Sequence, residues 1–184
     1  MDTATAYAAA AYAAAARPLS AVLAAVPSWD APSPCDDWSA RDVVRHLVET
    51  QRDLLGTHGV DAGALPDLDA DPAAAWEAHT ARVLAALADP AVPAIAYDGF
   101  FGPTTLGATL ERFYVFDMVV HRWDVARAAG LDAGLTDAEL ERLDRGADSF
   151  GGALYTDGIC KAGVTAPADA PREVAVLARL GRAA

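Results

Sequence analysis

The stretch LGATLERFYVFDMVVHRWDVARAAG, residues 106–130, decides the fold. Its apolar residues recur every three or four positions, which is the spacing of one face of an α-helix. Gly130 follows the pattern directly, and glycine commonly ends a helix. We therefore predict a helix over residues 106–129, the longest in the chain. Its main face comprises Leu106, Leu110, Phe113, Asp117, Val120, His121 and Asp124.

Asp117 and His121 are polar residues on this otherwise apolar face. They are four residues apart, so their side chains project from the same side of the helix. A buried carboxylate without a partner is strongly unfavourable. The pattern fits a site built around these two residues, but it also fits an ordinary interaction between neighbouring turns.

Shorter patterns predict further helices before and after this one. Pro18 should kink or divide the first, and Ser39 with Asp42 resembles the capping box that begins the second. The long connections at residues 57–69 and 90–103 are expected to be irregular or extended. The further helices are expected at about residues 3–26, 39–56, 71–88, 136–150 and 171–180.

These patterns define the fold class. No segment alternates strictly between apolar and polar residues, so the chain is predicted to be all-α. Helices of this length, joined by loops, favour a four-helix bundle with additional short helices. At 184 residues, we expect one domain spanning residues 1–184.

The charge of the chain limits its partners and location. The net charge is −12, which disfavours nucleic acid and membrane surfaces as partners. We see no secretory signal and no membrane span. The two cysteines, Cys35 and Cys160, are far apart and do not suggest a disulfide framework. We therefore expect a cytoplasmic protein.

His46 adds a third polar residue on an apolar helix face, between Val43 and Leu47. Two imidazoles and one carboxylate are good ligands for Zn²⁺, Ni²⁺ or Fe²⁺. Three protein ligands also leave positions open for water or substrate. A histidine hydrogen-bonded in the core, or lying at the surface, remains the alternative.

Other polar and aromatic residues give weaker signals. Asp124 either orients His121, faces solvent or pairs with Arg127. Cys35 is either a reactive thiol near a helix start or a buried cysteine. The expected roles of the remaining residues are exposure for Glu49, surface placement for His79, no role for the loop residue His58, and packing for Trp38 and Trp123.

Two stretches, PCDDWSARDVVRHL (34–47) and FDMVVHRWDVARAAG (116–130), carry a resemblance that extends to the tail at residues 166–182. They resemble actinobacterial metal-binding proteins related to the N-terminal domain of mycothiol-dependent maleylpyruvate isomerase, in the DinB/YfiT-like superfamily. The resemblance implies a DinB/YfiT-like four-helix bundle with a metal held by His46, Asp117 and His121. Asp117 stands where the isomerase has Glu. The chain also has no room for the isomerase's further C-terminal domain, which argues against maleylpyruvate as the substrate.

The resemblance leaves two functions open. One is a transferase or isomerase that uses a metal, most simply zinc, and a small-molecule thiol such as mycothiol on a small electrophilic substrate. The other is a non-catalytic metal-binding or stress-response bundle. Members of the superfamily are often dimers, so a homodimer packed through the GFFG run 99–102 is a further expectation.

Overall fold

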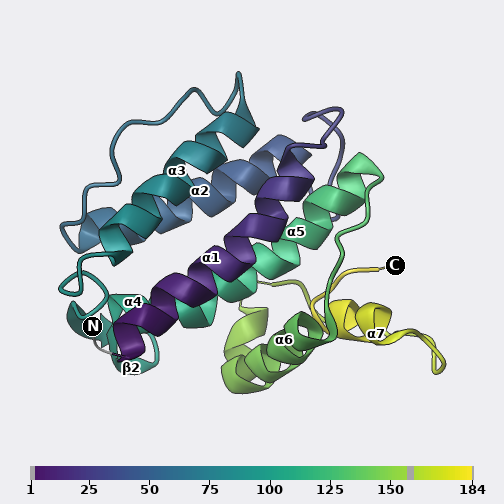
Figure 1. Cartoon of the computed structure of the whole chain (residues 1–184). Helices are drawn as coiled ribbons and strands as arrows, with labels where there is room; N and C mark the ends of the chain where they lie inside the picture. Colours follow the sequence, from purple (N-terminus) through teal and green to yellow (C-terminus); the bar gives the residue numbers. More distant parts are fainter. Residues whose placement is uncertain (1–2, 157–159, 184) are drawn as a thin grey trace. The chain divides into compact units, whose positions relative to one another are not determined.

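The computed structural model describes residues 3–156 and 160–183, and the chain forms two compact units, Met1–Asp132 and Ala133–Ala184. The first unit is a bundle of four long helices (Figure 1). This arrangement confirms the predicted all-α, DinB/YfiT-like four-helix bundle. The helices are α1 (Thr3–Leu23), α2 (Ala40–Thr57), α3 (Pro72–Leu87) and α5 (Val115–Ala129).

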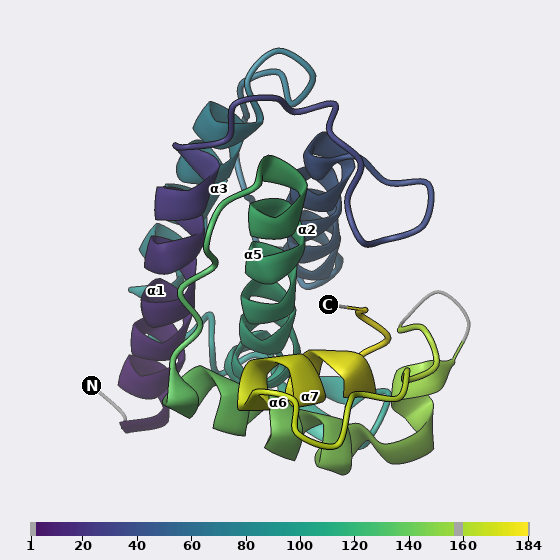
Figure 2. The ribbon, with the colours of Figure 1, turned by 90° about the vertical axis from the view of Figure 1, so that its right-hand side faces the viewer.

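Each long helix packs on two neighbours. Helix α1 contacts α3 and α5, and α2 contacts the same two helices, so α5 lies between α1 and α2 (Figure 2). Helix α1 is continuous through Pro18, so of the two predicted effects, a kink or a division, the division does not occur.

Side-chain contacts fix the helix directions. Asp69, just before α3, pairs with Arg45 in the second turn of α2, so these two helices start at the same end. Trp76 near the start of α3 donates to Ser20 near the end of α1, so these two helices run in opposite directions. The long connection from α2 to α3 therefore crosses the length of the bundle, which is the role of the predicted loop.

Local sequence signals account for the helix starts. The Ser39 hydroxyl accepts the Asp42 N–H, and the Asp42 carboxylate accepts the Ser39 N–H at 2.9 Å, which completes the predicted capping box. Asp71 caps α3, with Pro72 as its first residue, as the sequence also predicts. Each cap satisfies backbone N–H groups that the first turn of a helix leaves unpaired.

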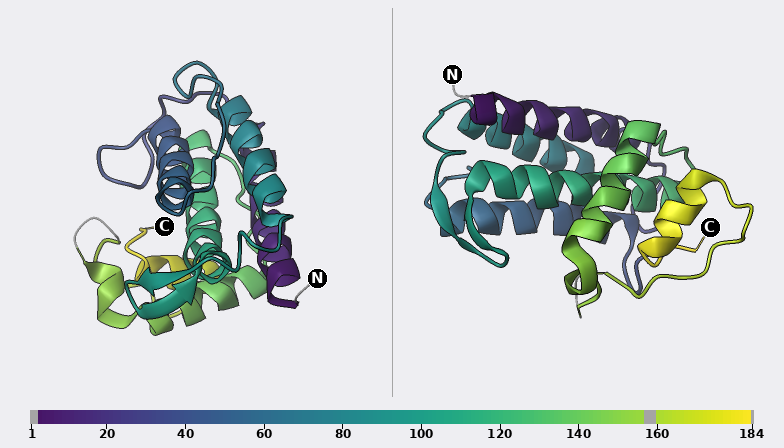
Figure 3. Two further views of the ribbon diagram at one scale, coloured as in Figure 1. Left: turned by 90° about the vertical axis from the view of Figure 1, so that its left-hand side faces the viewer. Right: turned by 90° about the horizontal axis from the view of Figure 1, so that it is seen from below.

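A small antiparallel hairpin lies in the segment expected to be extended or irregular. It consists of β1 (Ala96–Gly99) and β2 (Gly102–Thr105). The ring of His58, at the end of α2, packs against the ring of Tyr97 in a tilted arrangement, with centroids 4.0 Å apart. The hairpin therefore lies at the end of the bundle where α2 terminates (Figure 3).

The predicted helix over residues 106–129 is interrupted. It comprises α4 (Leu106–Thr109), a π-helical turn η1 (Leu110–Tyr114) and α5. A π-turn accommodates an extra residue and changes the phase of the helix face that follows it, and such turns are frequent at functional sites. The change of phase occurs three residues before Asp117.

A polar cluster lies inside the bundle. The Tyr12 hydroxyl donates to Gln51 Oε1 at 2.6 Å, and His79 Nε2 lies 2.9 Å from the same oxygen. All three side chains are fully buried. The predicted surface position of His79 is therefore wrong, because Gln51 on α2 provides a hydrogen-bond partner that a histidine inside a core requires.

Acid is expected to destabilise the fold through His79. Burial, together with the positive charge of Arg52, lowers the pKa of His79 to about 4. The unfolded chain takes up this proton near pH 6.5. The contribution of neutral, buried His79 to the unfolding free energy is therefore complete above pH 6.5 and is lost as the pH falls toward 4. Between pH 7 and 4 the wild type should lose about 3 kcal/mol more unfolding free energy than His79→Leu.

Urea unfolding of both proteins at the two pH values measures this difference. The matched control is His58→Leu, which keeps His79 and should lose as much as the wild type. An equal loss in the wild type and His79→Leu would contradict a neutral, buried His79.

The second unit contains α6 (Asp137–Phe150), a 3₁₀ turn η2 (Gly151–Tyr155) and α7 (Arg172–Arg179). Thr136 and Glu139 form the predicted capping box of α6. Arg179 on α7 pairs with Asp144 and Asp148 on α6, at 2.6 Å each. The organisation of residues 1–184 as a single domain stays a prediction. None of the helices in residues 3–156 and 160–183 combines the length and apolar character needed to cross a bilayer.

Candidate metal centre

The bundle brings together the three residues selected from the sequence. His46 on α2 faces Asp117 and His121 on α5. Asp117 Oδ2 lies 3.3 Å from His46 Nε2, and Asp117 Oδ1 lies 3.3 Å from His121 Nε2. One donor atom from each residue lies within 4.8 Å of the other two. We call these three residues the His/Asp/His cluster; that they ligate a metal stays a prediction.

The cluster joins two antiparallel helices. Tyr114 on the π-turn donates to the Thr50 carbonyl of α2. Asp117 lies one turn after Tyr114 on α5, and its partner His46 lies one turn before Thr50 on α2. Because α2 and α5 run in opposite directions, successive turns of α5 meet earlier turns of α2. This antiparallel pairing places an i, i+4 pair on α5 opposite a single histidine on α2.

The cluster is buried on one side and accessible on the other. The His121 side chain is 7% exposed, whereas His46 and Asp117 are 29% and 30% exposed. His121 is therefore the inner donor, and the other two border the accessible side. A small molecule approaching from solvent would meet His46 and Asp117 first.

Opposite charges control the protonation of the cluster. Burial acts to raise the pKa of Asp117, but His121 and His46 hold it well below its usual range. Burial acts to lower the pKa of His121, but the Asp117 charge and hydrogen bonds with Asp117, Asp124 and Cys35 raise it well above 6.5. Without a metal, the site is thus an ion pair of carboxylate and imidazolium. A divalent cation would compete with the imidazolium proton.

The loop before α2 forms one wall of the site. The Trp38 ring lies 5.0 Å from the His46 ring and 6.1 Å from the His121 ring, centroid to centroid. Cys35 Sγ lies 3.5 Å from Asp124 Oδ2. Trp38 was expected only to pack in the core, and its contact with both histidines is not evident from its position one residue before the helix cap.

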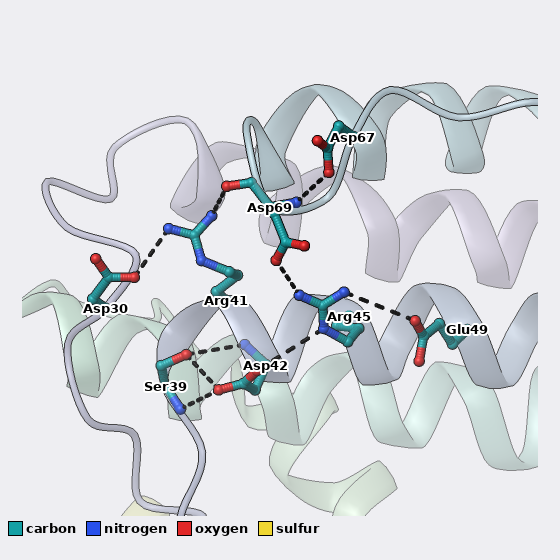
Figure 4. Close-up of polar contacts among 8 residues, drawn as sticks. All are labelled: Asp30, Ser39, Arg41, Asp42, Arg45, Glu49, Asp67 and Asp69. Atoms are coloured by element: carbon teal, nitrogen blue, oxygen red, sulfur yellow. Dashed lines mark hydrogen bonds and ion pairs between the residues drawn. The ribbon is translucent and has the colours of Figure 1, made fainter.

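Arginines at the start of α2 hold two loops in place (Figure 4). Arg41 pairs with Asp30 at 3.0 Å in the loop that carries Trp38, and it also donates to the Asp69 carbonyl in the connection to α3. Arg45 pairs with the Asp69 carboxylate. Such exposed pairs contribute little individually, but together they join both loops to the helix that carries His46.

The structure decides between the alternatives for two acidic residues. Asp124 is fully buried and lies 2.9 Å from His121 Nδ1, so a solvent-facing Asp124 is wrong. Glu49 is 57% exposed and 4.0 Å from Arg45, which confirms its predicted exposure.

The fold and the cluster together define the class: a four-helix bundle in which two adjacent helices present a group of two histidines and one carboxylate to an accessible face. Residues 12–126 match the family described as the mycothiol maleylpyruvate isomerase N-terminal domain. This match covers more than half of the chain and includes the whole His/Asp/His cluster, so the chain belongs to that family. No curated protein and no solved structure matches the chain.

Proposed function

We propose that the chain binds one divalent metal through His46, Asp117 and His121 and uses it, with a small-molecule thiol, to transform a small electrophilic substrate. Zinc is the first candidate, with nickel or iron as alternatives. Mycothiol is the thiol suggested by the family. The observation that carries the proposal is the convergence of two histidines and one aspartate from two helices within 4.8 Å of one another, with His46 and Asp117 partly exposed.

The donor spacing supports a metal. Tetrahedral zinc with bonds of roughly 2.0–2.1 Å places its ligand atoms roughly 3.3–3.4 Å apart. Asp117 approaches each histidine nitrogen with a different oxygen, at 3.3 Å each, and one donor atom from each of the three residues lies within 4.8 Å of the other two, so the donors are close enough together to share one cation. Two imidazoles and a carboxylate also match the donor preferences of zinc, nickel and iron. The shorter side chain of Asp117, compared with the glutamate of the isomerase, would hold a cation closer to α5.

The three cluster residues and Trp38 each have a part in this proposal. Three protein ligands would leave coordination positions for other ligands, and the accessible side of the cluster is bordered by His46 and Asp117. A divalent cation supplies charge that lowers the pKa of a coordinated thiol. Trp38 lies beside the rings of both histidines, with centroids 5.0 and 6.1 Å away, and would form part of the wall of the site. The cytoplasm, where small-molecule thiols are kept reduced, is the compartment in which such a function would operate.

The first test is metal content and thiol response in one preparation without an affinity tag. We expect elemental analysis to give about one equivalent of metal per chain. In the cobalt-substituted protein, added mycothiol should produce a thiolate-to-cobalt charge-transfer band, whereas a disulfide of the same thiol should not.

The outcomes separate the alternatives. Metal binding with a thiol band supports the proposal and justifies assays of thiol transfer to electrophiles. Metal binding without any thiol response would leave the non-catalytic metal-binding bundle. If no metal is bound, even after reconstitution, the proposal fails.

A further inference from the structure

A second set of polar contacts lies behind His121, on the side away from Asp117. Asp124 Oδ2 lies 2.9 Å from His121 Nδ1 and 3.5 Å from Cys35 Sγ. Asp124 is fully buried, and the His121 side chain is 7% exposed. Asp124 and His121 are one turn apart on α5, whereas Cys35 belongs to the loop before α2.

The two nitrogens of His121 face different partners. Nε2 faces Asp117 in the His/Asp/His cluster, and Nδ1 faces Asp124. An ionised carboxylate only accepts hydrogen bonds, so Nδ1 carries a proton in this contact. When Nδ1 keeps its proton, the only lone pair available to a metal is on Nε2. Asp124 therefore selects the tautomer in which Nε2 is the ligand.

We propose that Asp124 and Cys35 are positioning residues that hold His121 ready to bind the metal. This inference rests on the proposed function, since it assigns these residues a role toward the metal. Metal-bound histidines commonly donate their second N–H to a carboxylate, which orients the ring and increases its basicity. Asp124 does this directly, and Cys35 contributes by donating to Asp124 and through its own contact with His121.

The Cys35 thiol completes the arrangement by donating to the same Asp124 oxygen. A buried carboxylate needs hydrogen-bond donors to offset the loss of water. The thiol is a weak donor, but it comes from a different segment from α5 and thus fixes the carboxylate from a second direction.

The loop that carries Cys35 is itself held in place. Cys35 N–H donates to Ser33 Oγ at 3.2 Å, and Ser33 N–H donates to the Trp38 carbonyl at 2.8 Å. These short-range hydrogen bonds set the position of the thiol relative to Trp38, whose ring lies beside both histidine rings. The loop thus contacts the inner residue His121 through Cys35 and Asp124, and it contacts His46 on the accessible side through Trp38.

The same three residues could instead form a metal site of their own, and experiments can distinguish that role from the positioning role. Cys35, His121 and Asp124 also offer three donor atoms within 4.8 Å of one another. If a metal were bound there, the sulfur would be a ligand and His121 would bind through Nδ1. In our proposal the sulfur never contacts the metal, and the thiol is replaceable by another hydrogen-bond donor.

Zinc affinity, measured by chelator competition, tests the proposal with matched variants. Asp124→Asn keeps the shape but removes the charge, and should weaken zinc binding about 10–100-fold. Asp98→Asn makes the same chemical change at an exposed position in β1, far along the chain from the loop of Cys35, and should leave the affinity unchanged. Cys35→Ser keeps a donor and should bind zinc nearly as the wild type does, whereas Cys35→Ala should bind it more weakly.

Two spectroscopic readouts exclude a merely structural effect. Nitrogen NMR of the zinc-loaded wild type should show His121 with Nε2 coordinated and Nδ1 protonated. Cobalt-loaded protein without added thiol should lack a thiolate-to-cobalt band, and Cys35→Ser should have the same spectrum. Thermal unfolding of each variant confirms that it is folded.

The results distinguish this inference from the proposed function. If the wild type binds zinc and Asp124→Asn binds it equally well, the inference fails while the proposed function stands. A cobalt–thiolate band that disappears in Cys35→Ser, or coordination through Nδ1, also overturns it. If the wild type binds no metal, the proposed function fails first and the inference with it.

Discussion

His121→Ala is expected to reduce bound metal from about one equivalent per chain to almost none. His121 is the most buried of the three donors, and its ring joins Asp117 on one side to Asp124 on the other. Removing a residue that only orients a ligand weakens metal binding about 10–100-fold, so removing the ligand itself should cost about 100-fold or more. Elemental analysis after dialysis, followed by chelator competition, measures the loss.

The comparison needs a histidine that does not belong to the site. His58 packs against Tyr97 at the opposite end of α2 from the helix start, so His58→Ala removes one imidazole and leaves the cluster intact. It should retain the full equivalent of metal. Because His121→Ala leaves two acidic residues without their imidazole, circular dichroism should first establish that the variant folds. Unchanged affinity in a folded His121→Ala would place any metal elsewhere.

The helix starts could be predicted because their determinants are local. Ser39 with Asp42, and Asp71 with Pro72, carry their own hydrogen-bond partners or backbone geometry within one turn of the chain. The same locality explains why the bundle class could be predicted. Helix length and apolar spacing are properties of contiguous segments, and four such segments have few ways of burying their apolar faces.

The π-turn over Leu110–Tyr114 could not be predicted from the sequence. A search for a period of 3.6 residues treats the face from Leu106 to Asp124 as continuous, whereas the structure inserts one residue into that face. The preference for a π-turn over a regular α-helical turn here is explained by tertiary contacts. The Tyr114 hydroxyl reaches the Thr50 carbonyl on α2, a contact between residues far apart in the sequence.

The inner part of the site could be predicted only in part. His46, Asp117 and His121 stand out because each is a polar residue on an apolar face, and that signal is contained in the helix pattern. The contacts of Cys35 and Trp38 depend on the path of a loop, which no periodicity describes. His79 was misplaced for a related reason, since its partner Gln51 lies on another helix.

Trp76→Ala should have the largest effect on stability, a loss of about 3–5 kcal/mol in unfolding free energy. Trp76 on α3 is fully buried, and its Nε1–H donates to Ser20 Oγ on α1 at 3.0 Å. Truncation therefore opens a cavity between α1 and α3 and leaves the Ser20 hydroxyl without this donor. Urea unfolding followed by circular dichroism measures the change.

The matched variant Trp76→Phe also removes the N–H donor but leaves a much smaller cavity than Trp76→Ala, so the difference between the two variants reports the effect of the cavity. It should lose about 1–2 kcal/mol. A loss below about 1 kcal/mol for Trp76→Ala would contradict the tight packing of α1 against α3. Since the His/Asp/His cluster lies on α2 and α5, Trp76→Phe should bind metal as the wild type does. A loss of metal in this folded variant would mean that the packing of α1 on α3 also controls the spacing of α2 and α5.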